Sequence, residues 1–145
     1  MFLTNHLYIW AYGDVLRAFD FDAATNQFAP DANQGAVPAP YYPGAGLALS
    51  ANGNNAGIVW GIVATTNTAH GQGALYAFDA TNAGNLLWVS KDYWFATKFT
   101  IPTIANGKVY LPTTASPSGT GPSYSPQLRV YGLTHPAANF GASGR

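Results

Sequence analysis

Apolar residues alternate with polar or small residues in short runs along the chain, and this is the two-residue period of a half-buried β-strand. No stretch keeps the period of about 3.6 residues that an amphipathic helix requires. The pattern predicts an all-β protein with roughly ten strands and no helix. The predicted strands are Leu7–Tyr12, Val15–Phe21, Leu47–Ala51, Ile58–Ala64, Gly73–Asp79, Leu86–Val89, Thr100–Ala105, Lys108–Pro112 and Gln127–Leu133.

Turn-forming residues separate these runs. Gly13-Asp14 has the chemistry of a two-residue hairpin turn between the first two strands. Asn52-Gly53 favours the same kind of reversal after Leu47–Ala51. The Pro-rich segment Ala36–Gly46 is predicted to be a loop.

One strand pattern recurs three times, as Leu16–Asp20, Leu75–Asp79 and Leu128–Gly132, with starts 59 and 53 residues apart. Ala51-Asn52-Gly53 also recurs 54 residues later as Ala105-Asn106-Gly107. Self-similarity at such a period indicates a repeat architecture. Four short antiparallel strands per repeat are typical of a β-propeller blade, so we predict a partial propeller.

The repeat phases divide the chain into four parts. Residues 1–35 are predicted to form a partial blade, 36–90 a complete blade with four strands between Pro43 and Ser90, 91–133 a partial final blade, and 134–145 a flexible tail. This makes about two and a half blades, whereas closed propellers have about 4 to 8. Self-association, with three copies as one route to a closed ring, or pairing with another chain is therefore expected. The edge strands Leu7–Tyr12 and Gln127–Leu133 would lie at those contacts.

Composition narrows the function classes. The chain has 6 basic and 6 acidic residues, a formal net charge of zero, and only 8% charged residues, which removes the electrostatic basis for nucleic-acid binding. The absence of Cys excludes disulfides and thiolate metal sites. The few charges and many small polar residues favour an extracellular or periplasmic location, although the first residues do not resemble a signal peptide. The longest apolar stretches, such as residues 57–65, are too short for a membrane span.

The segment Ala77–Trp88 resembles the tryptophan-docking motif of pyrroloquinoline-quinone-type β-propeller repeats. Pro102–Tyr110 is similar to the start of the next blade in that family, and Leu128–Leu133 looks like the end of the last blade in exported bacterial members. The resemblance implies the C-terminal blades of such a propeller. It also allows an alternative function as part of a quinone-dependent alcohol or sugar dehydrogenase, with pyrroloquinoline quinone and calcium as cofactors. That site takes acidic calcium ligands, and often a vicinal disulfide, that no position in this chain matches.

The motif has a physical interpretation as well. Trp88 is predicted to be buried against the neighbouring blade, where the small Ala77 leaves room for its ring. Asp79 is expected to accept hydrogen bonds from free amides of the following turn. Gly84 is expected to supply a positive φ. All four residues are therefore interpreted as structural.

No catalytic group of residues emerges. His6, His70 and His135 are far apart in sequence and do not have metal-ligand spacing. Asp20 and Asp22 lie on one face of a strand, but Asp20 repeats the position of Asp79, which indicates turn capping rather than acid–base chemistry. No Gly-x-Ser-x-Gly elbow is present.

Aromatic residues in loops are the remaining candidates for function. They suit a carbohydrate or protein partner if exposed, and the alternative for the second group is packing over a blade edge. The sequence therefore favours a non-catalytic scaffold or binding module. The candidate ligand or partner contacts are Tyr41, Tyr42, Tyr93, Trp94, Phe95 and Tyr124.

Overall fold

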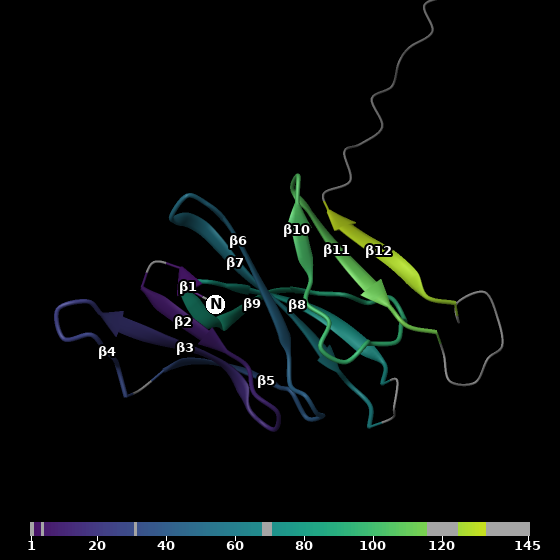
Figure 1. Cartoon of the computed structure of the whole chain (residues 1–145), viewed down its shortest axis with the longest axis horizontal. Coiled ribbons are helices and arrows are strands. Elements are labelled where there is room, and N and C mark those ends of the chain that lie inside the picture. Colours follow the sequence, from purple (N-terminus) through teal and green to yellow (C-terminus); the bar gives the residue numbers. More distant parts are fainter. Residues whose placement is uncertain (1, 4, 31, 68–70, 116–124, 133–145) are drawn as a thin grey trace, which may run out of the picture.

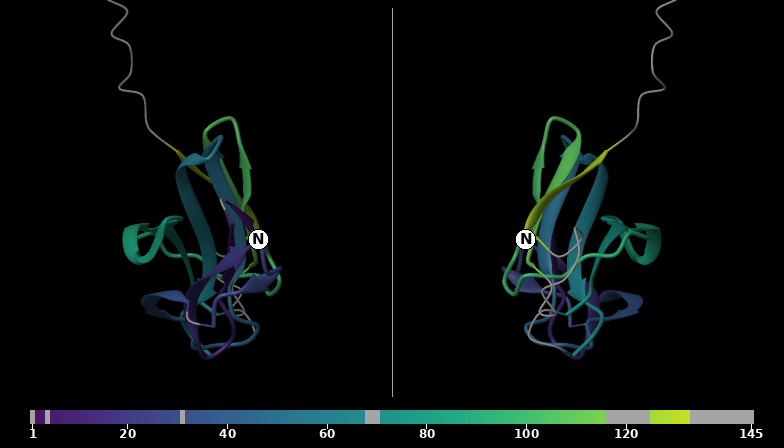
Figure 2. Two further views of the ribbon diagram at one scale, coloured as in Figure 1. Left: turned by 90° about the vertical axis from the view of Figure 1, so that its left-hand side faces the viewer. Right: turned by 90° about the vertical axis from the view of Figure 1, so that its right-hand side faces the viewer.

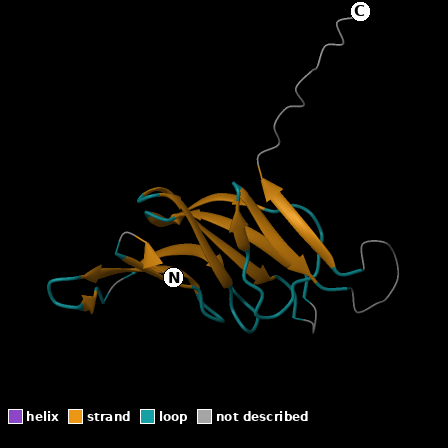
Figure 3. Ribbon diagram, turned by 45° about the horizontal axis from the view of Figure 1, so that its top comes forward, coloured by secondary structure: helices purple, strands orange, loops and turns teal. Residues whose placement is uncertain are grey.

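The computed structural model describes residues 2–3, 5–30, 32–67, 71–115 and 125–132. Every regular element in these ranges is a strand, and none is a helix, which confirms the all-β prediction (Figure 3). The predicted tail 134–145 lies outside the described residues. The strands are β1 (Phe2–Leu3), β2 (His6–Ile9), β3 (Val15–Asp22), β4 (Gln27–Phe28), β5 (Asn33–Pro38), β6 (Gly46–Asn52), β7 (Asn55–Ala64), β8 (Gly73–Asp79), β9 (Asn82–Val89), β10 (Thr103–Ala105), β11 (Lys108–Thr113) and β12 (Gln127–Gly132).

The described strands form three antiparallel sheets that follow one another along the molecule (Figure 1). The first sheet has the order β1-β2-β3-β4, and β5 pairs with the opening half of β3. The second sheet has the order β6-β7-β8-β9, and the third β10-β11-β12. None of the three closes on itself, so the molecule is an open array of sheets.

The second sheet confirms the four-stranded sheet predicted between Pro43 and Ser90. The hairpin predicted at Asn52-Gly53 is also present, and Gly53 has a φ of 61°. Its sequence counterpart in the third sheet has positive φ at both central residues, 50° at Asn106 and 70° at Gly107, as a type I′ turn requires. Figure 2 shows both hairpin tips at the same end of the molecule.

The first hairpin differs from the prediction. Gly13-Asp14 does not form a two-residue turn, because β2 ends at Ile9 and the chain leaves the sheet over residues 10–14. The cause is Trp10, whose side chain is buried and whose indole Nε1 donates to the Asp14 carbonyl at 3.2 Å. The loop predicted at Ala36–Gly46 begins only after Pro38, because β5 pairs with β3 up to that residue.

The predicted strand Thr100–Ala105 is shorter than expected and begins at Thr103. Phe99 adopts a left-handed φ of 64°, which turns the chain just before this segment. Pro102 then lacks the backbone N–H that a paired strand would use. The loop consequently extends over the residues that precede Thr103.

Two apolar clusters hold neighbouring sheets together. Between the first and second sheets, Tyr8 and Leu16 pack with Val59 and Phe78, and the Tyr8 hydroxyl donates to the Ala80 carbonyl at 2.6 Å. Between the second and third sheets the cluster consists of Ile62, Leu75, Trp94, Ala96, Val109 and Leu111. Each sheet therefore buries one face against the next, as in packed β-layers.

Candidate functional site

Three exposed aromatic side chains lie in a row at one edge of the molecule. Tyr12, Tyr42 and Phe99 are 59%, 58% and 70% exposed. The ring centroids of Tyr12 and Tyr42 are 6.4 Å apart, and those of Tyr42 and Phe99 are 5.9 Å apart. We call these three residues the aromatic surface. Contiguous exposed apolar groups of this kind mark binding sites more often than isolated ones do.

Three separate loops contribute to the aromatic surface. Tyr12 lies in the β2–β3 connection, Tyr42 between β5 and β6, and Phe99 between β9 and β10. A β-bridge between Ala11 and Gly44 ties the first two loops together. Gly44 has a φ of 94°, and a Cβ there would lie 2.7 Å from the Tyr12 backbone nitrogen, so only glycine allows this close approach. The loops of Tyr12 and Tyr42 are thus fixed to each other by backbone contacts.

Phe99 has an unusual backbone for an aromatic residue. Its φ of 64° lies in the left-handed region, which costs about 1–2 kcal/mol for a residue with a Cβ. Burial of the side chain does not offset this backbone cost, since Phe99 is the most exposed large apolar residue in the described part of the chain. Strain held at an exposed ring is a feature found at ligand-binding positions.

A small cavity of about 70 Å³, lined by both polar and apolar residues, adjoins the aromatic surface. Its lining includes the predicted residues Tyr41 and Tyr42. The Lys98 ammonium lies 5.5 Å from the centroid of the Tyr42 ring, in cation–π geometry. Hydroxyl and amide groups complete the wall and can donate to or accept from a polar ligand. The polar side chains of this wall are Thr66, Asn67, Thr97 and Thr100.

The other predicted contact residues are not part of this surface. Tyr93 is exposed, but its ring packs against Phe95, with centroids 5.1 Å apart, on a different part of the molecule. Trp94 and Phe95 are buried, so their prediction as exposed ligand contacts is wrong. Tyr124 lies outside the described residues.

Trp94 is buried because the sequence leaves space for its ring. A Cβ at Gly73 would collide with the six-membered ring of Trp94, so the indole packs directly over the glycine backbone. The Gly73 amide donates to the Trp94 carbonyl at 2.9 Å, and this bond fixes the segment beside β8. Trp94 is therefore a packing residue, but it packs between the second and third sheets rather than over a sheet edge.

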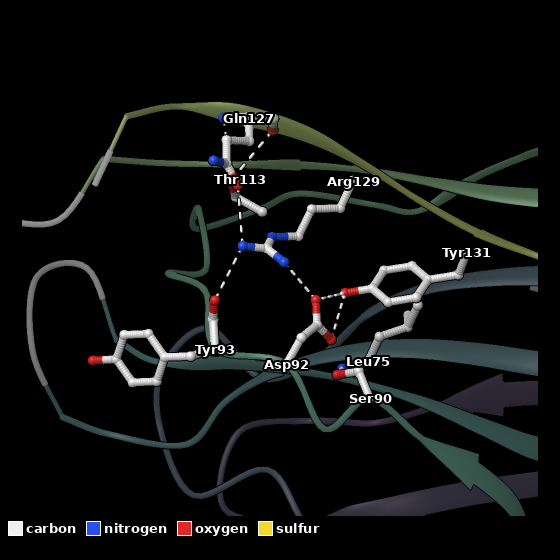
Figure 4. Close-up of polar contacts among 8 residues, drawn as sticks. All are labelled: Leu75, Ser90, Asp92, Tyr93, Thr113, Gln127, Arg129 and Tyr131. Atoms are coloured by element: carbon white, nitrogen blue, oxygen red, sulfur yellow. Dashed lines mark hydrogen bonds and ion pairs between the residues drawn. The ribbon is translucent and has the colours of Figure 1, made fainter. Parts of the chain in front are cut away.

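A polar cluster fastens the segment after β9 to β12 (Figure 4). The Arg129 guanidinium pairs with the Asp92 carboxylate through Nη1 and donates through Nη2 to the Tyr93 carbonyl at 3.1 Å. The Tyr131 hydroxyl donates to the same carboxylate at 2.9 Å. Burial and the bond to Asp92 raise the pKa of Tyr131 well above its usual range. The cluster is a structural clamp between the second and third sheets.

The docking-motif residues are only partly as predicted. Trp88 is 41% exposed, so its predicted burial is wrong, although its ring contacts Tyr131 and Trp60. The reason is that Trp88 lies on the outer strand β9 and lines an open space between the second and third sheets. Between them is an open apolar groove of about 630 Å³ that Trp60, Trp88 and Tyr131 line.

The turn after β8 was predicted more accurately. Ala77 is buried, and the Asp79 carboxylate accepts from the Thr81 amide at 2.8 Å and from its hydroxyl at 2.7 Å, as expected for turn capping. These bonds lower the pKa of Asp79. Gly84 does not have the predicted positive φ. A Cβ there would lie 3.1 Å from the Asn82 side-chain oxygen, so packing in the turn rather than φ favours glycine.

Carboxylates in the described part of the chain are engaged in local contacts. Asp14 binds Arg17, Asp20 binds His6, and Asp22 caps the β3–β4 turn. Asp79 and Asp92 have the partners given above. The described residues include no group of three His, Cys, Asp or Glu that could hold a metal ion. The residues present therefore do not fit the acidic calcium-and-quinone site that the family resemblance implies.

The sequence interpretation missed Tyr12, Lys98 and Phe99. Tyr12 ends a predicted strand, and Phe99 precedes one, so neither was assigned to a loop. The signal available was the pair of strand-breaking residues Gly13 and Pro102 beside them.

Comparison with known family models, curated proteins and solved structures gives no match. Among the described residues, no helix has the length and apolar character needed to cross a membrane.

Proposed function

We propose that this chain is a non-catalytic β-propeller segment of an exported bacterial protein and that it binds a neutral carbohydrate through the aromatic surface. The observation that carries the proposal is the row formed by Tyr12, Tyr42 and Phe99. The succession of three open antiparallel sheets, the middle one four-stranded, supports the propeller assignment, because sequential four-stranded sheets are the units of that fold.

The chemistry around the row favours a sugar. One face of a pyranose ring presents C–H groups, which pack against the electron-rich face of an aromatic ring. Sugar hydroxyls need donors and acceptors at the side, and Thr97, Thr100 and Asn67 supply them in the adjoining cavity. Lys98 is the one charged residue among the described residues that line the cavity, so a highly charged ligand has little to pair with there.

The proposal is tested by calorimetric titration of the chain with soluble cello-, chito- and malto-oligosaccharides. We expect saturable binding to at least one of them, and a loss of at least tenfold in affinity for Tyr42→Ala. Tyr93→Ala is the matched control, because Tyr93 is similarly exposed but lies outside the aromatic surface. Absence of binding to all three series, or equal binding by Tyr42→Ala and the parent, would overturn the proposal. Release of new reducing ends by the parent would contradict the non-catalytic assignment.

A further inference from the structure

Equivalent cross-strand pairs recur in the three sheets. An aromatic residue on the second repeat strand faces a small or β-branched residue on the third. Since cross-strand partners share a face of the sheet, these pairs define one corresponding face in each sheet, which we call the forward face. The pairs are Tyr8 with Ala18, Trp60 with Ala77, and Tyr110 with Val130.

The third repeat strand buries its forward-facing leucine in the first two sheets and exposes it in the third. Leu16 and Leu75 occupy one repeat position on the forward face, and both are 0% exposed. Leu128 has the same position in the third sheet and is 64% exposed. Val130, on the same face, is also exposed. The third sheet therefore presents an apolar face of a type that is buried twice elsewhere in this molecule.

We call the opposite face of each sheet its backward face. A forward face is covered by the backward face of the next sheet. In the second sheet the pair Val59 and Phe78 packs against the forward face of the first sheet. In the third sheet Val109 and Tyr131 pack in the same way against the second. The first sheet has a corresponding backward pair, Leu7 and Phe19. Neither residue belongs to the two apolar clusters between the described sheets, and both are only partly buried.

We propose that the forward face of the third sheet binds the backward face of the first sheet in a second copy of this chain. The two open faces lie at opposite ends of the molecule in Figure 1, so one copy does not cover its own. The contact would continue the two intersheet interfaces already present. Because the formal net charge of the chain is zero, no net electrostatic repulsion opposes the association of two copies.

The number of sheets points to a dimer. Each copy has three sheets, so two copies contribute 3 + 3 = 6 and three copies contribute 9. Propeller rings contain about 4 to 8 sheets. Copies joined head to tail form a closed ring when the rotation from one copy to the next adds up to a full turn. In a ring of two copies, both open faces of each chain are covered by the other copy.

The first test is the mass of the chain in solution, from light scattering during size-exclusion chromatography. We expect twice the mass of one chain for the parent, and a single-chain mass for Leu128→Asp. Leu87→Asp is the matched control, since Leu87 is an exposed leucine on β9 of the middle sheet and should leave the dimer intact. A parent that stays at single-chain mass over the micromolar range, or a Leu128→Asp dimer, would overturn the inference.

A second test determines whether the contact is head-to-tail or symmetric, and it does not require a variant that disrupts the dimer. Leu75 and Leu111 pack in one cluster, and their repeat counterparts at the proposed contact are Leu128 and Ile9. Because the chain contains no Cys, Leu128→Cys mixed with Ile9→Cys should give an intermolecular disulfide between the two variants. Cross-linking of Leu128→Cys only to itself would show a symmetric contact and refute the head-to-tail arrangement. Glycan binding is a separate readout, because the substituted residues Leu128 and Ile9 are not members of the aromatic surface.

Discussion

The rings of Trp88 and Tyr131 meet edge to face, with centroids 5.5 Å apart and an interplanar angle of 64°. This contact joins β9 of the second sheet to β12 of the third. Trp88 therefore links neighbouring sheets as the repeat motif predicts, yet it does so from a half-exposed position at the mouth of the groove. The tryptophan that is fully buried between these sheets is Trp94.

The two tryptophans should differ in their contribution to stability. Trp94→Ala is expected to lower the free energy of unfolding by about 3–5 kcal/mol, as for other buried aromatic truncations. Trp88→Ala should cost about 1–2 kcal/mol, because much of its ring remains in water in the folded state. Urea unfolding of both variants measures the difference, and a larger loss for Trp88→Ala would contradict this order.

Replacing Trp94 by Phe should cost much less than replacing it by Ala. The indole Nε1 of Trp94 is buried without a hydrogen-bond partner among the described residues. Removal of that N–H relieves its desolvation penalty of about 1–3 kcal/mol and offsets part of the lost packing. We expect Trp94→Phe to unfold within about 1.5 kcal/mol of the parent, a range typical of near-isosteric core changes. A loss as large as that of Trp94→Ala would show that the N–H has a partner.

Phe99 should show opposed effects on stability and binding. Phe99→Gly and Phe99→Ala both remove the exposed ring, but only glycine adopts the left-handed φ without strain. We expect Phe99→Gly to be more stable than Phe99→Ala by about 1 kcal/mol, and both to lose glycan binding. Thermal unfolding and calorimetric titration measure the two effects. Equal stability of the variants would mean that residue 99 is not held in the left-handed region.

Asp92 and Arg129 should be energetically coupled. Their side chains are 40% and 21% exposed, and the pair is extended by the Tyr131 hydroxyl. A double-mutant cycle with Asp92→Ala and Arg129→Ala is expected to give a coupling free energy of about 1 kcal/mol in favour of the pair. The Asp14–Arg17 pair is the control, and its coupling should be smaller because its residues are three apart in sequence and stay near each other in the unfolded chain. Coupling that is no greater than in the control would argue against the clamp.

Tyr8 should make stability depend on alkaline pH. Burial, with a smaller effect of Asp79 and Asp20, raises the pKa of Tyr8 to about 12. The folded protein thus favours the neutral phenol, and this stabilisation is full below the unfolded pKa of about 10 and is lost as the pH rises through 12. Tyr8→Phe should remove the part of this dependence that comes from Tyr8, leave the part from Tyr131, whose pKa is also raised, and cost about 1 kcal/mol at neutral pH through loss of the bond to Ala80. An alkaline unfolding profile unchanged by Tyr8→Phe would exclude Tyr8 as the group responsible.

Local sequence determined the strands whose pattern is repeated. β8 begins and ends at the predicted residues, because alternation and the flanking Gly and Asp define both of its ends. The turn at Asn106-Gly107 follows from the tolerance of these residues for positive φ. Asp79 caps its turn because the carboxylate bonds only with residues that follow it closely in sequence. These features depend on neighbours in the chain, so a single sequence is sufficient to predict them.

Tertiary structure decided the features that depend on contacts between distant residues. Whether Trp88 or Trp94 is buried depends on which of them packs on a glycine of a neighbouring strand and which lines the open groove between two sheets. The aromatic surface requires three loops, separated by up to about 90 residues of chain, to be held together by close backbone approaches such as that at Gly44. Periodicity gives no information on such approaches, because packing between sheets sets the distance between loops.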